Sequence, residues 1–224
     1  MLNKQKGNMY GFVTHTWNVV KGKCIHDCVY CYMKRFPQKD LWFDVSELKV
    51  NLGDDKFIFV GSSTDMFASN VSSDWIKKVL FVCKSFPNNK YLFQTKNPHR
   101  FLEFADLFPI NSVLCVTIES NKSNDDVNCA DSPSMRVRYL EVLLDNYIFP
   151  IHITIEPVMD FDISEFLYLL KKCSPSQINI GADSNRSRTY VYPEPSKEKL
   201  SLLITELKKF SVVYEKNNLK RLIK

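Results

Sequence analysis

The feature that most constrains the fold is an alternation of short apolar runs with amphipathic segments along most of the chain. The apolar runs are hydrophobic at successive positions and are bounded by glycine, proline or polar residues, which is typical of strands buried on both faces of a parallel sheet. The segments between them carry apolar residues at helical spacing. We therefore expect strands at residues 57–60, 90–94, 112–118, 151–155 and 177–180, and helices at 74–85, 97–107, 132–145, 164–173 and 198–210.

An N-terminal strand at 14–20 brings the pattern to about six βα units, too few for a closed eight-stranded barrel. The pattern alone leaves two architectures open, an open partial barrel and a doubly wound sheet. In both, the carboxyl ends of the strands carry the chemistry. No linker, internal repeat or low-complexity tract divides the 224 residues, so we expect one α/β domain over residues 1–224.

Composition excludes several classes of protein. Hydrophobic residues make up 45% and charged residues 25%, a balance typical of soluble globular proteins. No apolar run is long enough for a transmembrane helix, and the polar N-terminus does not resemble a secretory signal, so we expect a cytoplasmic protein without membrane contact. Seven cysteines, an odd number, argue against a disulfide framework. The net charge of +5 is a weak indication of an anionic partner.

The cysteines are unevenly spaced, and three of them, Cys24, Cys28 and Cys31, form a C-x3-C-x2-C motif. Three thiolates on one loop can bind three irons of a [4Fe–4S] cluster and leave the fourth iron open to a small molecule. A zinc site is the alternative, but zinc needs a fourth ligand and His26, inside the loop, is poorly placed.

The other four cysteines form no second motif. Cys83 and Cys173 fall on expected helices and Cys115 in an expected strand, where we expect buried thiols, whereas Cys129 lies in a polar loop and is expected to be exposed.

The motif, with Tyr30 directly before its third cysteine, resembles the cluster loop of radical S-adenosylmethionine (radical SAM) enzymes. The resemblance implies a partial (βα)6 barrel of parallel strands, a [4Fe–4S] cluster held by the three cysteines, and S-adenosylmethionine as second cofactor, with Tyr30 against its adenine. Four further segments are similar to a small phage-associated and bacterial branch of unknown substrate, itself similar to spore photoproduct lyase, a DNA repair enzyme. These segments are Thr16-Trp17-Asn18, Thr95-Lys96, Thr117-Ile118-Glu119 and Ile155-Glu156-Pro157.

Small and polar residues follow the expected strands and are candidates for the S-adenosylmethionine site. After the strand at 57–60, glycine and small hydroxyl residues let a backbone approach a ligand, and the resemblance implies that this stretch holds the methionine amino group. Polar residues at the next strand ends suit the ribose hydroxyls and the methionine moiety, and Gly181 would allow close approach of the adenine. The candidates are Gly61, Ser62, Ser63, Thr64, Asp65, Thr95, Lys96, Thr117, Glu119 and Gly181. Ordinary turns and solvated strand ends remain the structural alternative for each.

One arginine is expected to bind the methionine carboxylate. The related repair enzymes have a P-S-x-x-x-R segment, and Pro133-Ser134 in this sequence selects Arg138 over Arg136. A guanidinium suits a carboxylate because its planar fork binds both oxygens. The alternative is a surface arginine on a helix.

The resemblance implies reductive cleavage of S-adenosylmethionine to a 5′-deoxyadenosyl radical, which abstracts hydrogen from a substrate, with electrons from a reductase or flavodoxin-type donor. Glu156 and Asp183 are candidate substrate contacts. A thiol that the lyase supplies near the end of its second strand is absent from Gly61-Ser62-Ser63, which argues against photoproduct reversal.

We expect a nucleic acid or nucleotide as substrate, because basic residues flank the cluster loop and follow the sixth strand. They are Lys21, Lys23, Lys34, Arg35, Lys39, Arg186 and Arg188. A peptide or small-metabolite substrate, and a non-catalytic metal-stabilised nucleic-acid-binding protein, are the alternatives.

Overall fold

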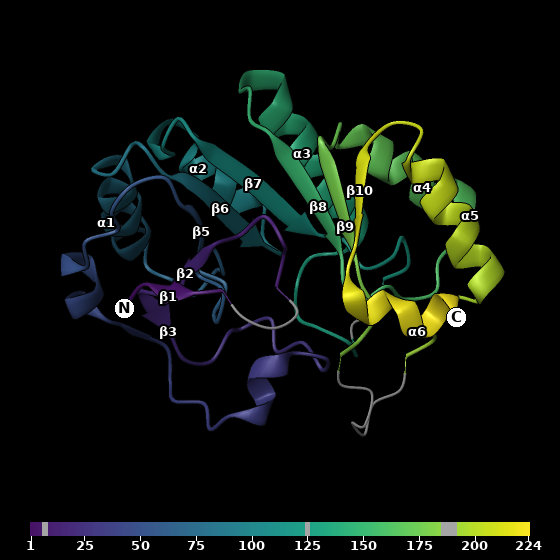
Figure 1. Cartoon of the computed structure of the whole chain (residues 1–224), viewed down its shortest axis with the longest axis horizontal. Helices are drawn as coiled ribbons and strands as arrows, with labels where there is room; N and C mark the ends of the chain where they lie inside the picture. The colour runs from purple at the N-terminus through teal and green to yellow at the C-terminus, as the bar shows by residue number, and fades with distance from the viewer. Residues whose placement is uncertain (6–8, 124–125, 185–191) are drawn as a thin grey trace.

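The computed structural model describes residues 1–5, 9–123, 126–184 and 192–224, which form one α/β domain around a sheet of eight strands (Figure 1). The strands of this sheet are β1 (Asn3–Lys4), β2 (His15–Trp17), β5 (Phe57–Val60), β6 (Lys90–Thr95), β7 (Ser112–Thr117), β8 (Ile151–Ile155), β9 (Gln177–Ile180) and β10 (Val212–Glu215). A second sheet pairs β3 (Val20–Lys21) with β4 (Trp42–Phe43). The α-helices are α1 (Ser73–Lys84), α2 (His99–Glu103), α3 (Pro133–Asn146), α4 (Ile163–Lys172), α5 (Lys197–Leu207) and α6 (Lys220–Ile223), and the 3₁₀ helices are η1 (Tyr32–Arg35), η2 (Val45–Lys49), η3 (Ala105–Leu107) and η4 (Asn217–Leu219).

The order of the strands decides between the two architectures. From β2 to β10 the large sheet runs β2-β5-β6-β7-β8-β9-β10, with every neighbouring pair parallel. A doubly wound sheet reverses its strand order at a switch point, and this sheet never does. The antiparallel strand β1 and the strand β10 stand at the two ends of the order and are not paired with each other. The fold is therefore the open, parallel, barrel-like α/β fold expected from the sequence.

Three elements differ from the sequence-based expectation. The expected strand at 14–20 is two strands, because the chain leaves the large sheet after Trp17 and Val20 pairs instead with Phe43 of β4. The expected helix at 97–107 is divided between α2 and η3, because the backbone of Phe104 departs from helical geometry, with φ −118° and ψ 12°. Strand β10 was not expected at all, and it adds a seventh parallel strand to the sheet.

The two faces of the sheet are filled differently. Alternate strand residues such as Ile58 and Leu114 pack outward against the helices, in the main core. Their neighbours Phe59 and Cys115 face the inside, where they pack with Tyr10 from the segment 9–13. This N-terminal segment therefore fills the inside of the open barrel.

Glycine is needed where the segment 9–13 passes β10. A methyl group on Gly11 would lie 2.8 Å from the hydroxyl oxygen of Tyr214 in β10, which is closer than side-chain atoms approach one another. Gly11 thus lets the N-terminal segment lie against the last strand of the sheet.

The four cysteines outside the motif lie where the sequence placed them. Cys83, Cys115 and Cys173 are buried and Cys129 is exposed, and no described cysteine is in a disulfide. Those predictions are confirmed. Among the described residues, no helix combines the length and the apolar character that crossing a bilayer requires.

Phe67 follows β5 and is fully buried among the rings of Phe93, Phe101 and Phe108. We predict that Phe67→Ala lowers the free energy of unfolding by about 3–5 kcal/mol, through lost burial and the cavity left behind. Phe81→Ala on α1 is the matched control, because that ring is 73% exposed, and it should change stability by no more than about 0.5 kcal/mol. Urea denaturation of both variants measures the difference, and equal effects would contradict this packing.

Candidate functional site

A cavity of about 1180 Å³ lies at the carboxyl ends of the strands and is bounded on one side by the cysteine loop. Its volume exceeds that of most single-ligand pockets. The site residues expected from sequence that line it are Cys24, Cys28, Tyr30, Cys31, Gly61, Ser62, Ser63, Thr64, Asp65, Thr95, Lys96, Thr117, Glu156 and Asp183. Three others, Glu119, Arg138 and Gly181, do not line it. The structure thus brings most of the expected residues, from six separate segments of the chain, to one space.

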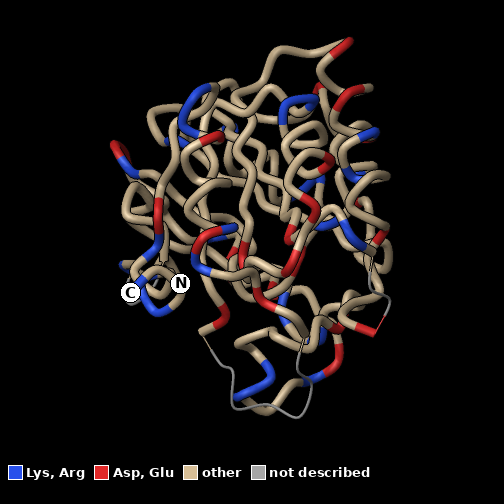
Figure 2. The backbone as a smooth tube through the Cα atoms, turned by 90° about the vertical axis from the view of Figure 1, so that its right-hand side faces the viewer, with Lys and Arg blue, Asp and Glu red and all other residues tan. Residues whose placement is uncertain are grey.

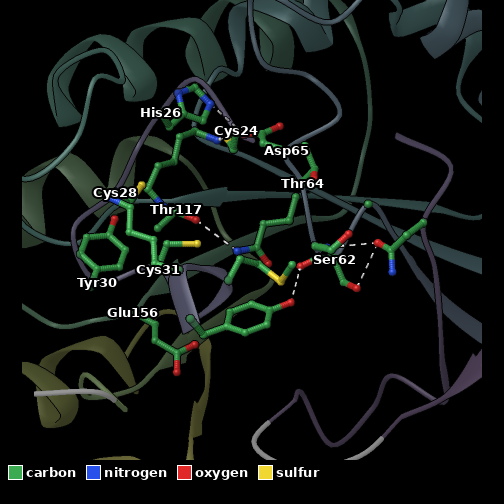
Figure 3. Close-up of a pocket in the computed structure, with 18 of the residues that line it drawn as sticks. Cys24, His26, Cys28, Tyr30, Cys31, Ser62, Thr64, Asp65, Thr117 and Glu156 are labelled. Carbon is green, nitrogen blue, oxygen red and sulfur yellow. Dashed lines mark hydrogen bonds and ion pairs between the residues drawn. The ribbon is translucent and has the colours of Figure 1, made fainter. Parts of the chain in front are cut away.

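The three cysteines of the motif lie along the wall of this cavity (Figure 3). The loop makes two short turns, in which Asp27 N donates to Cys24 O at 3.2 Å and Cys31 N donates to Cys28 O at 3.1 Å. Within the described ranges, no three His, Cys, Asp or Glu side chains are gathered closely enough to hold one metal ion. A [4Fe–4S] cluster has a different requirement, because each thiolate binds a different iron and the sulfurs stand further apart.

Burial changes the acidity of two of the three thiols. Burial raises the pKa of Cys24 to about 12, and burial also raises the pKa of Cys28, although the nearby ammonium of Lys96 acts in the opposite direction. Buried thiols of this kind stay protonated unless a metal replaces the proton. Burial raises the pKa of Cys83, Cys115 and Cys173 as well, so the cavity position of Cys24, Cys28 and Cys31, rather than their pKa, marks them as candidate cluster ligands.

Asp65 anchors the cysteine loop to the sheet. Its carboxylate accepts hydrogen bonds from His26 Nε2, Thr95 Oγ1 and the backbone nitrogen of Lys96, each at 2.9 Å, and from the backbone nitrogen of Phe67. Burial alone would raise the pKa of Asp65, but the hydrogen bond and charge of His26 outweigh burial and lower it. Three of these donors meet Oδ2 and one meets Oδ1, and Asp65 also lines the cavity, so its role toward a methionine amino group stays a prediction.

The same bond settles the orientation of His26. The Nε2 atom of His26 faces Asp65, as Figure 3 shows, and the imidazole is buried. The Nε2 atom of His26 thus anchors the loop, whereas its Nδ1 atom is buried and has no hydrogen-bond partner among the described residues.

The turn after β5 is joined to the start of the cysteine loop. Thr64 Oγ1 donates to Gly22 O at 2.9 Å, and Asn18 Oδ1 accepts from Ser62 Oγ and from the backbone nitrogen of Ser63. Gly61 begins this turn with φ +79°, a conformation that glycine adopts without strain. Gly61 is therefore required by the turn itself.

Glu119 was expected at the ribose hydroxyls and lies instead in a buried network behind the cavity wall. Its carboxylate accepts from the hydroxyl of Tyr30, from Arg136 Nη1 at 2.7 Å and from Lys96 Nζ at 3.4 Å. Burial alone would raise the pKa of Glu119, but the charges of Arg136 and Lys96 lower it to about 2. The expected role is corrected, because the carboxylate is only 3% exposed and its partners are protein groups.

Neither Arg138, which was expected at the methionine carboxylate, nor Arg136 lines the cavity. Both arginines lie on α3, but Arg138 is exposed and does not line the cavity, whereas Arg136 is fully buried. Arg136 donates to the backbone oxygens of Thr117 and Asp131 as well as to Glu119. Two residues along a helix turn a side chain through about 200°, so only one of the two can face the sheet.

Glu156 lines the cavity together with Lys216, which follows β10. Lys216 Nζ donates to Glu156 Oε2 at 2.6 Å, and Asn218 Nδ2 donates to Glu156 Oε1 at 3.0 Å. A Cβ on Gly181 would lie 2.9 Å from both Glu156 Oε1 and Asn218 Oδ1. The expectation that Gly181 admits an adenine is corrected, since these two side chains fill the space beside it.

Sequence reasoning missed several residues that line the cavity, namely Tyr10, Tyr32, Gln94 and Lys216. Gln94 had a usable signal, because it is the one amide in an apolar strand, and its Nε2 donates to Thr117 Oγ1 while its Oε1 accepts from the Tyr10 hydroxyl. Lys216 had none, because its position depends on the unexpected strand β10. Arg186 and Arg188 lie outside the described residues.

The protein is a partial α/β barrel with three cysteines on one loop at the carboxyl ends of its strands. Comparison with known proteins gives its family. Residues 9–155 match the family described as "Protein of unknown function (DUF5131)", and the chain belongs to that family. No curated protein matches the chain.

Several solved structures share the fold. Spore photoproduct lyase complexed with dinucleoside spore photoproduct has a TM-score of 0.68 and 10% identity, covering 94% of this chain and 79% of its own. A mutant of the lyase with bound AdoMet and dinucleoside spore photoproduct has a TM-score of 0.63 and 10% identity, over 93% and 78%. SuiB of Streptococcus suis bound to precursor peptide SuiA has a TM-score of 0.62 and 8% identity, over 88% and 48%. At such identities the likeness establishes the fold.

The depressed pKa of Glu119 predicts how stability depends on pH. Because its pKa is about 2 in the folded protein and near 4.5 when unfolded, the stabilisation is complete above about pH 4.5 and is lost as pH falls toward 2. Glu119→Gln should cost about 3–5 kcal/mol at neutral pH, because Arg136 and Lys96 lose their buried partner. Urea denaturation should show that the difference in free energy of unfolding between wild type and Glu119→Gln becomes smaller below pH 4.5. A difference that stays constant down to pH 2.5 would contradict the network.

Arg136 and Arg138 give a matched pair for the register of α3. We predict that Arg136→Met lowers the free energy of unfolding by about 3–5 kcal/mol, since it leaves Glu119 buried without its main partner. Arg138→Met should change stability by no more than about 0.5 kcal/mol. Thermal or urea denaturation distinguishes the two, and the reverse ranking would overturn this register.

Proposed function

We propose that this chain is a radical SAM enzyme. The observation that carries the proposal is the C-x3-C-x2-C loop, whose three thiols line one large cavity at the carboxyl ends of a partial barrel. A structure of the same fold is described with AdoMet bound, which agrees with this reading. A [4Fe–4S] cluster bound here would supply the electron that cleaves S-adenosylmethionine reductively to a 5′-deoxyadenosyl radical, which abstracts hydrogen from a substrate.

The residues of the chain have separate tasks in this proposal. Cys24, Cys28 and Cys31 hold the cluster, and the bonds of Asp65 to His26 and of Thr64 to Gly22 fix their loop against the sheet. Fixing the loop keeps the open coordination site directed into the cavity, which matters because the position of the cofactor decides which hydrogen is abstracted.

Polar groups on the cavity wall bind S-adenosylmethionine in this proposal. The side chains are those of Ser62, Ser63, Thr95, Lys96 and Thr117, all of which line the cavity. Tyr30 offers its ring to the adenine in this proposal, and the bond of its hydroxyl to Glu119 fixes the orientation of the ring. Lys96 Nζ lies 5.3 Å from the centroid of the same ring.

A nucleic acid or nucleotide is the proposed substrate. Only some of the basic residues named from the sequence are placed to bind its phosphates. Lys21 is paired with Asp44 and Glu47, and Lys34 with Asp27, so those two charges are neutralised. Lys39 does not line the cavity, whereas Lys23 and Arg35 do. Glu156 and Asp183 are the proposed substrate contacts, and a reductase or flavodoxin-type protein is the proposed electron donor.

A peptide substrate is the second candidate, because SuiB, which shares the fold, was solved with a precursor peptide bound. Direct binding measurements with oligonucleotides, described below, separate the two substrate classes.

The cluster and its chemistry are tested by replacing the three cysteines. We predict that changing Cys24, Cys28 and Cys31 together to Ala abolishes the visible absorption and the iron content of anaerobically reconstituted protein, along with reductant-dependent formation of 5′-deoxyadenosine. Cys129→Ala is the matched control, because that thiol is exposed and outside the cavity, and it should retain all three properties. Retention of about four irons per chain by the triple variant would refute the assignment.

A further inference from the structure

A second concave surface, the C-terminal groove, adjoins the cavity. It has a volume of about 580 Å³ and is lined by Asp183, Ser184, Asn217, Asn218, Lys220, Arg221 and Lys224. Asp183 and Ser184 line the cavity as well, so one short segment forms the wall shared by the two spaces. Figure 1 shows α6 at the end of the sheet where β10 finishes, and Figure 2 shows Lys and Arg gathered next to the C-terminus.

The groove carries an excess of positive charge. Lys220, Arg221 and Lys224 face a single acidic side chain in its lining, that of Asp183. Arg221 is committed to the protein, because it pairs with Glu194 and donates to the backbone oxygen of Asp183. Lys220 and Lys224 are exposed and make no ion pair with a described residue. They are four residues apart in one helical turn, so their ammonium groups project from the same face.

The positive charge continues from the groove toward the cysteine loop. Arg35, at the end of η1, donates from Nη2 to the backbone oxygen of Ser184 at 3.2 Å, on the wall that divides the two spaces. Asn218 Nδ2 donates to Ser184 Oγ at 2.9 Å and to Glu156, which fixes the groove to the cavity wall. Arg35 therefore lies at the wall shared by the groove and the cavity.

We propose that the C-terminal groove binds the phosphodiester backbone of a nucleic acid strand, one nucleotide of which enters the cavity. Lysine ammonium groups attract successive phosphates without reading sequence. Exposed aromatic rings favour a nucleic acid over an acidic peptide, because Tyr32 at the start of η1 and Phe36 just after it offer faces on which bases stack.

This inference rests on the proposed function in one respect, namely that a nucleotide enters the cavity. Binding of the strand in the groove can be measured independently of that function. The experiment compares reconstituted wild type with Lys220→Gln/Lys224→Gln for affinity toward a short fluorescent single-stranded oligodeoxynucleotide, by anisotropy over a range of salt. The variant should bind about ten-fold more weakly at low salt, and the slope of log affinity against log salt should shrink by about 1.4, as two lost contacts require. Lys77→Gln/Lys90→Gln, which removes two exposed lysines on α1 and at the start of β6, should match wild type.

Several outcomes would overturn the proposal. One is no binding of the oligonucleotide at low salt, and another is equal loss in the two double variants. Displacement by inorganic phosphate or a mononucleotide at matched phosphate concentration would make the groove a site for small anions only. Displacement by polyglutamate at matched charge would assign it to an acidic protein. Cluster content and 5′-deoxyadenosine formation, measured without oligonucleotide in the wild type and in the Cys24/Cys28/Cys31 triple variant, report on the proposed function separately.

Discussion

The hydrogen bonds of the Asp65 carboxylate hold the site together. A carboxylate buried at the end of a strand is stable only if donors surround it, and Asp65 finds four, on the cysteine loop, on β6 and in its own turn. The loop has little regular structure, so its position depends on such contacts. Because one carboxylate ties it to two strand ends, the thiols and the polar groups of the sheet keep a fixed geometry, which a cofactor spanning both would need.

The network around Glu119 stabilises neighbouring parts of the cavity wall in the same way, and it meets the Asp65 network at Lys96. Tyr30 and Lys96 line the cavity, and both are held from behind by a carboxylate that Arg136 keeps charged. The two networks thus follow one principle, in which a buried anion orients the cavity-lining groups through short bonds. Of the two anions, Asp65 itself lines the cavity, whereas Glu119 lies behind the cavity wall.

Local patterns predicted the fold well because the information they carry is local. The apolar run at 57–60 is a buried strand whatever surrounds it, and C-x3-C-x2-C places three thiols on one loop by spacing alone. Contacts across the chain could not be read in this way. Nothing near Asp65 in sequence reveals His26 as its partner, and a choice between Arg136 and Arg138 needs the rotation of α3 relative to the sheet. Strand β10 was not predicted for another reason. Val212 is exposed at the sheet edge, and four residues are too few to show the alternation of apolar and polar side chains that marks a strand.

The N-terminal segment that fills the barrel also has a chemical consequence. A carbon-centred radical survives only where water and stray hydrogen donors are kept away, and an open barrel would admit solvent from beneath. Met9 to Val13 close that route, with the Tyr10 ring under Lys216 and its hydroxyl tied to Gln94 and Thr154. In the proposed function, this packed segment would shield a radical in the cavity from solvent on the side where Tyr10 lies.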